Sequence, residues 1–164
     1  MPNWCRNELE VLAGEETLTS FLEAVTKPPE DSLLHFQEQD AYILENLLPH
    51  PLKQADLGTE VYEGDELELK FSFLTAWSPP CAGVETISKL YPAATFILTW
   101  HESGRCFMGG ATYRDGVVLH EVNIEGPEYP QFAGDFDGDE YQKHCDDVCD
   151  VRDRIENELW EAAR

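Results

Sequence analysis

The chain has 164 residues, which suits a single domain that can bury a hydrophobic core without disulfides or a structural metal. Its 33 acidic residues far outnumber its 11 lysines and arginines, and the formal net charge is −22. A chain this negative repels nucleic acid and anionic membranes, so we expect neither as a direct partner. The charge favours a solvated surface or a basic protein partner.

The negative charge is concentrated in the N-terminal and C-terminal parts of the chain. Residues 1–70 carry a net charge of −12 and residues 124–164 carry −9, whereas residues 71–123 carry only −1. The five cysteines include no C-x-x-C pair, and the sequence shows no signal peptide and no long apolar run. We therefore expect reduced, mostly buried thiols and a cytoplasmic location.

The first expected elements are a strand and a helix. Residues 4–12 end in an alternation that puts Glu10 on the polar side, which predicts a strand. An acidic stretch then opens a helix with an apolar face, and residues 27–29, Lys-Pro-Pro, end it. Beyond it we expect loops, interrupted by a short strand at residues 33–36 and a helical turn at residues 42–48.

The centre of the chain gives a clearer pattern. Residues 66–74 alternate apolar and polar side chains, which predicts a strand with one buried face. The run Ser78-Pro79-Pro80 predicts a helix start with Ser78 as its capping residue. Pro92 closes that helix, and its apolar side includes Leu90.

Three more strands and a last helix complete the pattern. The strands are expected at residues 94–101, 105–113 and 117–123, joined by short turns. Residues 124–140 predict a loop, and residues 141–163 predict a helix with one apolar side. Together these elements indicate an α+β fold in which helices cover one face of a mostly antiparallel sheet.

Four blocks of sequence resemble one known family. They are M-P-N-W-C-R-N-E-L-E-V, F-L-T-A-W-S-P-P, K-L-Y-P-A-A-T-F and W-H-E-S-G-R-C-F-M-G-G, and together they resemble the YubB-like family of phage, plasmid and integrated-element proteins. The resemblance covers residues 1–25 and 71–119. It implies a ferredoxin-like domain and a mobile-element origin, but no activity. On this basis we expect one domain, residues 1–164, with a family-like core at 1–123 and an acidic loop and helix at 124–164.

Trp77 and Ser78 lie where the central strand gives way to a helix. Backbone N–H groups at a helix N-terminus can hold an anion or a carboxylate, so this corner is a pocket candidate together with His101 and Glu102. Alternatively, Trp77 packs over the two prolines and Ser78 only caps the helix. Capping alone accounts for Ser-Pro-Pro, so we favour this second interpretation.

Two His-Glu pairs could do metal or acid–base chemistry. His101-Glu102 and His120-Glu121 fall on strands that we expect to be neighbours in the meander. If they faced each other, they could ligate a metal or work as acid and base. Their spacing does not ensure that they do, so we favour surface or half-buried polar residues.

Two further patterns have an incomplete set of metal ligands. Residues 135–140 are rich in aspartate but lack the glycine that a calcium loop requires at its sixth position. Cys145 and Cys149 share a helix face but have no second pair of zinc ligands in the sequence. We therefore expect no metal and no cofactor.

The last helix places acidic side chains along one stripe. Successive members stand about one turn apart, roughly 5–6 Å along the axis. The stripe consists of Asp146, Asp150, Asp153 and Glu161, with Asn157 completing it, and Asp135, Asp137, Asp139 and Glu140 add to its field. Such rows can imitate a phosphate backbone and attract a basic, nucleic-acid-binding surface; the alternative is a wet acidic face.

These features favour an interaction protein rather than an enzyme. We expect it to occupy the basic surface of a host nucleic-acid-binding or defence protein, as an inhibitor in the host cytoplasm, using its carboxylates as a nucleic-acid mimic. The alternative is a small-molecule-binding protein or enzyme with a pocket near Trp77, His101 and Glu102. The sequence contains no nucleophile–base signature, P-loop or dinucleotide-binding motif.

Overall fold

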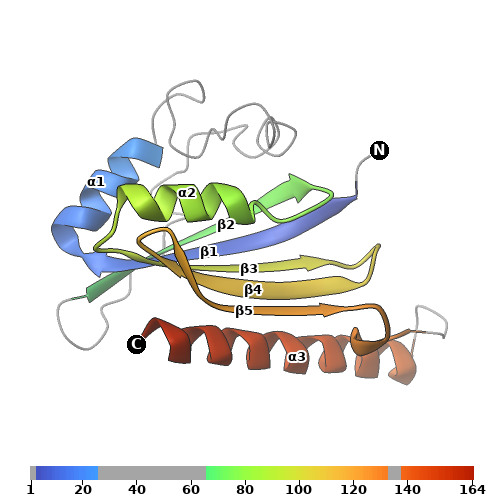
Figure 1. Cartoon of the computed structure of the whole chain (residues 1–164). Coiled ribbons are helices and arrows are strands. Elements are labelled where there is room, and N and C mark those ends of the chain that lie inside the picture. Colours follow the sequence, from blue (N-terminus) through green and yellow to red (C-terminus); the bar gives the residue numbers. More distant parts are fainter. Residues whose placement is uncertain (1–2, 26–65, 133–137) are drawn as a thin grey trace.

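The structure, a computed structural model, describes residues 3–25, 66–132 and 138–164 (Figure 1). The strand expected at 33–36 and the helical turn expected at 42–48 lie outside these residues. In chain order, the described elements are β1 (Trp4–Gly14), α1 (Glu15–Val25), β2 (Glu66–Ala76), α2 (Cys81–Leu90), β3 (Thr95–Glu102), β4 (Phe107–Arg114), β5 (Val117–Glu125), a 3₁₀ turn (Gly126–Glu128) and α3 (Asp139–Ala163).

Five strands form one sheet in the order β2-β1-β3-β4-β5, and every neighbouring pair is antiparallel. Leu9 of β1 lies opposite Phe71 of β2 on one side and Leu98 of β3 on the other, which fixes the register at the centre of the sheet. The α+β class and the mostly antiparallel sheet expected from the sequence are confirmed.

The main hydrophobic core lies between the sheet and helices α1 and α2, which share one face of it (Figure 1). Phe21 of α1 is fully buried at its centre. Its ring meets Phe71, Tyr91 and Phe96 edge-on, with centroids 5.8, 5.3 and 5.5 Å away. Edge-to-face pairs of this kind add to the stabilisation from area burial, so Phe21 ties α1 to both the sheet and the end of α2.

Helix α3 covers the opposite face of the sheet (Figure 1). The expected placement of helices on one face therefore holds for α1 and α2, while α3 forms a third layer. Its buried residues Ile155, Leu159 and Ala163 pack on side chains of β3, β4 and the segment after β5. The sheet side of this second core includes Ile97, Met108, Ile124 and Tyr129.

Close contact between α3 and β4 depends on glycine. A Cβ atom on Gly110 would collide with the Leu159 side chain and lie 3.0 Å from the Leu98 carbonyl oxygen. The helix end is also hydrogen-bonded to β4, because Thr112 Oγ1 donates to the Leu159 carbonyl at 3.0 Å and Arg114 donates to the Ala163 carbonyl at 2.8 Å. The Ala163 carbonyl is one of those that the helix itself leaves open at its C-terminal end, so the bond from Arg114 caps the helix.

Two details of the side-chain pattern differ from expectation. Alternation predicts a solvated side for Glu10, but Glu10 is buried because Lys70, on the neighbouring strand, donates a hydrogen bond to its carboxylate. Helical spacing predicts that Leu90 is buried, but it is 59% exposed because α2 ends at this residue.

The pair Gly109 and Gly14 offers a test of the sheet geometry. A Cβ on Gly109 would collide with the Val122 carbonyl oxygen and come within 2.8 Å of the Trp100 ring, whereas one on Gly14 would meet nothing within 4 Å. We expect Gly109→Ala to lower the free energy of unfolding by about 1–3 kcal/mol. Gly14→Ala should change it by less than about 0.5 kcal/mol. Urea denaturation of both variants checks this, and equal midpoints would contradict the packing described.

Candidate functional site

The acidic stripe of α3 faces solvent along its length. Asp146, Asp150, Asp153 and Glu161 are all exposed, as is Asn157 between them. The opposite side of the helix carries the buried residues that pack on the sheet. The helix start extends the stripe, because Asp139 and Glu140 are also exposed, while Asp135 and Asp137 lie outside the described residues.

Few cations on α3 offset these carboxylates. Arg152 contacts Asp153 at 3.9 Å and Glu156 at 3.5 Å, and both contacts lie at a partly or largely exposed surface. Exposed ion pairs of this length contribute little and leave most of the negative field in place. Asp150 and Glu161 form no ion pair with any described residue.

The corner after β2 is held by a buried polar network. Asn7 Nδ2 donates to Thr75 Oγ1 at 2.8 Å, and Thr75 Oγ1 donates to the Ser78 carbonyl at 2.7 Å. The Trp77 backbone N–H donates to the Asn3 carbonyl at 2.9 Å. These bonds place Trp77 at a φ of 72°, in the left-handed region that a bulky residue adopts only when its surroundings demand it.

The capping role expected of Ser78 is wrong. Helix α2 begins at Cys81, its N-cap residue is Pro80, and no side chain caps it. Ser78 instead belongs to the turn, where its N–H donates to the Ala76 carbonyl at 2.9 Å and its own carbonyl accepts from Thr75. Trp77 is 48% exposed. The sequence Ser-Pro-Pro therefore marks a rigid corner, set by Asn7 and Thr75, rather than a helix cap.

His101 and Glu102 do not share a pocket, because successive residues of a strand point to opposite faces. Glu102 is buried and closes the β3–β4 turn, where its carboxylate accepts the N–H groups of Gly104 at 2.7 Å and Arg105 at 2.6 Å. His101 faces α3, and its Nε2 lies 2.7 Å from the Tyr129 hydroxyl. Burial first, and then the charges of Arg6 and Arg152, lower the pKa of His101.

A small open cavity of about 60 Å³ lies between α3 and the sheet. Of the four pocket candidates named from the sequence, only His101 reaches it; Trp77, Ser78 and Glu102 do not. Residues from β1, β3, β4 and α3 surround it. The polar ones are Arg6, Glu8, Thr99, His101, Cys149 and Arg152.

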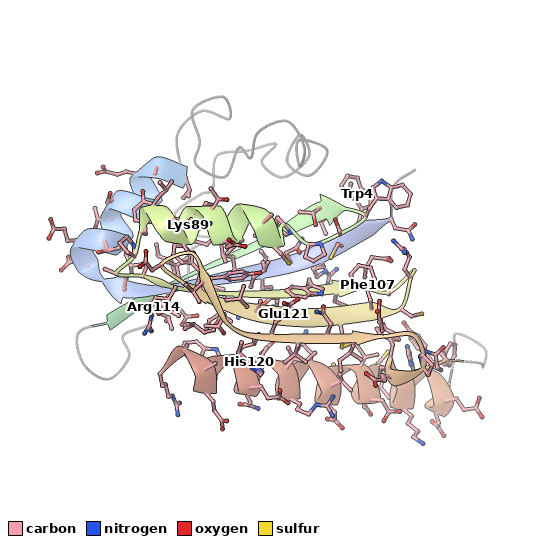
Figure 2. The ribbon with its side chains drawn as sticks, viewed as in Figure 1. Trp4, Lys89, Phe107, Arg114, His120 and Glu121 are labelled. Atoms are coloured by element: carbon pink, nitrogen blue, oxygen red, sulfur yellow. The ribbon has the colours of Figure 1, made fainter. Side chains whose placement is uncertain are left out.

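The two His-Glu pairs do not meet, and the expectation that they lie on neighbouring strands is wrong. They are on β3 and β5, with β4 between them. His120 lies on the α3 side of β5 (Figure 2), and its Nε2 is 3.4 Å from a Glu158 oxygen of α3. In the described part of the chain, no three His, Cys, Asp or Glu side chains are placed together to hold a metal ion. Residues 135–137 of the aspartate-rich segment 135–140 lie outside it.

All five cysteines are free thiols, but their surroundings differ. Cys5 is buried in the main core, and burial raises the pKa of its thiol to about 12. Burial also raises the pKa of Cys81. Cys149 is exposed on α3 at the edge of the cavity, and Cys145 and Cys106 are half-buried. Core packing thus describes Cys5, but not Cys149.

The cavity residues Arg6, Thr99 and Arg152 are not apparent from the sequence as a site. They come from three separate elements, and only the register of β1 on β3 and the seating of α3 bring them together. One signal was present: Arg6 is a lone cation on the polar side of β1, in a chain with three times as many acids as bases.

Residues 58–143 match the model of one protein family, described as the ferredoxin-like domain in Api92-like protein. The chain belongs to this family. The match confirms the ferredoxin-like class, and it ends at Lys143, so most of the acidic helix α3 lies beyond the matched part of this ferredoxin-like domain. No curated protein and no solved structure matches the chain.

The described residues include three α-helices, α1, α2 and α3. None of them combines the length and the apolar character that a membrane span needs.

The left-handed backbone of Trp77 can be tested with two substitutions that both remove the indole. Only glycine adopts a positive φ without strain, so we expect Trp77→Gly to be more stable than Trp77→Ala by about 1 kcal/mol. Thermal or urea unfolding of the two variants measures the difference. If Trp77→Ala were the more stable of the two, the corner would not have the backbone described.

Cysteine reactivity tests the burial of the core. A pKa raised from 9.0 to about 12 lowers the thiolate population of Cys5 on the order of a thousandfold, whereas Cys149 is exposed. We expect iodoacetamide to modify Cys149 in the native protein and Cys5 only after unfolding. Peptide mass spectrometry of a time course reads out both sites. Comparable rates at the two cysteines in the native state would refute this arrangement.

Proposed function

We propose that this protein is an acidic interaction protein that occupies the basic surface of a host nucleic-acid-binding or defence protein and thereby inhibits it. In this proposal the outer stripe of α3, defined by Asp146, Asp150, Asp153 and Glu161, imitates the phosphates of a nucleic acid. The observation that carries the proposal is the one-sided exposure of this stripe on a helix whose other side is packed.

The length and spacing of the stripe suit a nucleic-acid-binding surface. From Asp146 to Glu161 it extends about 22 Å along the helix at ~1.5 Å per residue. Counting Asn157 between Asp153 and Glu161, successive positions of the stripe are three or four residues apart, which keeps them on one side of the helix. A basic groove that neutralises several phosphates at once would meet several carboxylates at once.

The rigidity of α3 also supports the proposal. Leu159 is fully buried in the second core, and the carbonyls of Leu159 and Ala163 are hydrogen-bonded to β4. A stripe fixed in this way does not have to be ordered on binding, which reduces the entropic cost of association. The net charge of −22 would also accelerate the encounter with a basic partner.

The origin of the chain in a phage, plasmid or integrated element is part of this proposal. The supporting observation is the resemblance of residues 1–25 and 71–119 to the YubB-like family, whose members belong to such elements. Proteins of mobile elements act inside a host cell, where host nucleic-acid-binding and defence proteins are the available basic partners. We place the protein in the host cytoplasm for the same reason.

Two matched triple variants test the role of the stripe. Asp146→Asn/Asp150→Asn/Glu161→Gln removes three carboxylates of α3, and Glu15→Gln/Glu16→Gln/Glu23→Gln removes three exposed carboxylates of α1, on the other face of the sheet. Both make the net charge less negative by the same amount. Immobilised wild-type protein should retain basic nucleic-acid-binding proteins from host lysate at low salt. The α3 variant should lose them and the α1 variant should keep most of them.

Two further conditions sharpen this experiment. Raising the salt concentration should release the retained proteins, because the contact is largely electrostatic. Added double-stranded DNA should displace them, because it competes for the same basic surface. Retention that withstands both salt and DNA, or that is lost equally in the two variants, would contradict the proposal.

A further inference from the structure

Basic side chains from three elements converge on the cavity between α3 and the sheet. Arg6 of β1 and His101 of β3 are register partners, so their side chains stand next to each other on the face that α3 covers in part. Arg152 of α3 lines the same cavity from the helix side. This arrangement is unexpected in a chain with a net charge of −22.

Little negative charge inside the cavity opposes these cations. Glu8 is the one carboxylate among its lining residues. Lys70 lies 3.2 Å from Glu8 and also binds Glu10, so this carboxylate is already paired with a cation outside the lining. The lining thus places two guanidinium groups beside one carboxylate that Lys70 already binds.

The arginines have hydrogen-bond donors to offer. Arg6 is exposed, and its guanidinium group forms no ion pair with any described residue. Arg152 contacts Asp153 and Glu156 at 3.9 and 3.5 Å, well beyond the ~2.7–2.9 Å of a charge-assisted hydrogen bond. Each guanidinium has five N–H donors in a fork that matches carboxylate and phosphate oxygens.

His101 is positioned by its contacts with Tyr129. Its Nε2 is 2.7 Å from the Tyr129 hydroxyl, and the two rings stack with centroids 5.8 Å apart. Burial lowers its pKa first, and the charges of Arg6 and Arg152 lower it further. An anion in the cavity would relieve this concentration of positive charge.

The size of the cavity limits what it can hold. A volume of about 60 Å³ has room for only a few water molecules. This suits one phosphate or carboxylate group, with the rest of the molecule outside. On β1, strand alternation puts Trp4 on the same face as Arg6, two residues away. Trp4 is 39% exposed at the end of the sheet where β1 begins (Figure 2), and it does not line the cavity.

We infer that this cavity is a binding site for the oxyanion of a small molecule, bound by Arg6, His101 and Arg152, with the rest of the molecule outside the cavity. The shared chemistry is a phosphate or a carboxylate. The site is separate from the outer stripe of α3, and it does not depend on the partner proposed for that stripe.

Isotope-labelled protein titrated with inorganic phosphate, and separately with sodium acetate, tests this inference at constant ionic strength. We expect saturable NMR shifts of the backbone amides at Arg6, Thr99, His101 and Arg152 with at least one of the two anions. A response to phosphate alone or to acetate alone supports the site and identifies the preferred oxyanion. The absence of saturable shifts at these positions with both anions would overturn the inference, whatever the variants show.

Arginine variants give a matched control on the same helix. Arg152→Gln and Arg6→Gln should each lower the affinity for the anion about tenfold or more, because each removes charged hydrogen bonds. Arg154→Gln, two residues along α3 and outside the cavity lining, removes the same charge and should leave the affinity unchanged. An equal loss in Arg154→Gln and Arg152→Gln would show a general charge effect and overturn the site.

Discussion

The structure depends on the close contact between α3 and the centre of the sheet. Gly110 has no side chain, so Leu159 can lie directly on β4, and Ile155 packs beside it. This contact buries the second face of β3 and β4 and turns a sheet with one covered face into the middle layer of three (Figure 1). A larger residue at this position would push the helix away, because a packed interior has no space for it.

The same contact determines which charged side chains of α3 face solvent and which face the sheet. With Ile155 and Leu159 facing inwards, helical periodicity sends the carboxylates of the stripe outwards. It also brings Arg152 over β1 and β3, where Arg6 and His101 lie. One helix thus presents an acidic surface to solvent and completes a cationic cavity beneath its edge. The two proposals concern different sides of α3 and different chemistry, so the failure of one leaves the other standing.

Local sequence patterns predict most of the fold. Alternation locates β1 and β2, turn residues separate β3, β4 and β5, and the apolar side of α3 is apparent from the spacing of Ile155 and Leu159. These features depend on neighbours in the sequence. The corner at Ser78 could not be predicted correctly, because Ser-Pro-Pro suits both a helix cap and a turn, and the choice is made by Asn7, 68 residues before Thr75.

The two candidate sites also differ in whether local sequence patterns predict them. The stripe of α3 follows from helical spacing alone and is predictable, but the cavity depends on the register of two strands and on the position of a helix over them. Sequence order suggests that His101 and Glu102 act together, whereas the strand sends them to opposite faces. No local pattern indicates that Arg6 and Arg152 meet.

Native-state hydrogen exchange tests the central claim most directly, because it measures whether α3 and the sheet are one cooperative unit. If α3 is packed as described, the amides around Ile155 and Leu159 should open with nearly the same free energy as those of β4, close to that of global unfolding. If these α3 amides exchanged by local opening at a much lower free energy while β4 stayed protected, α3 would not be part of the folded core. The rigid stripe and the cavity would then both lose their structural basis.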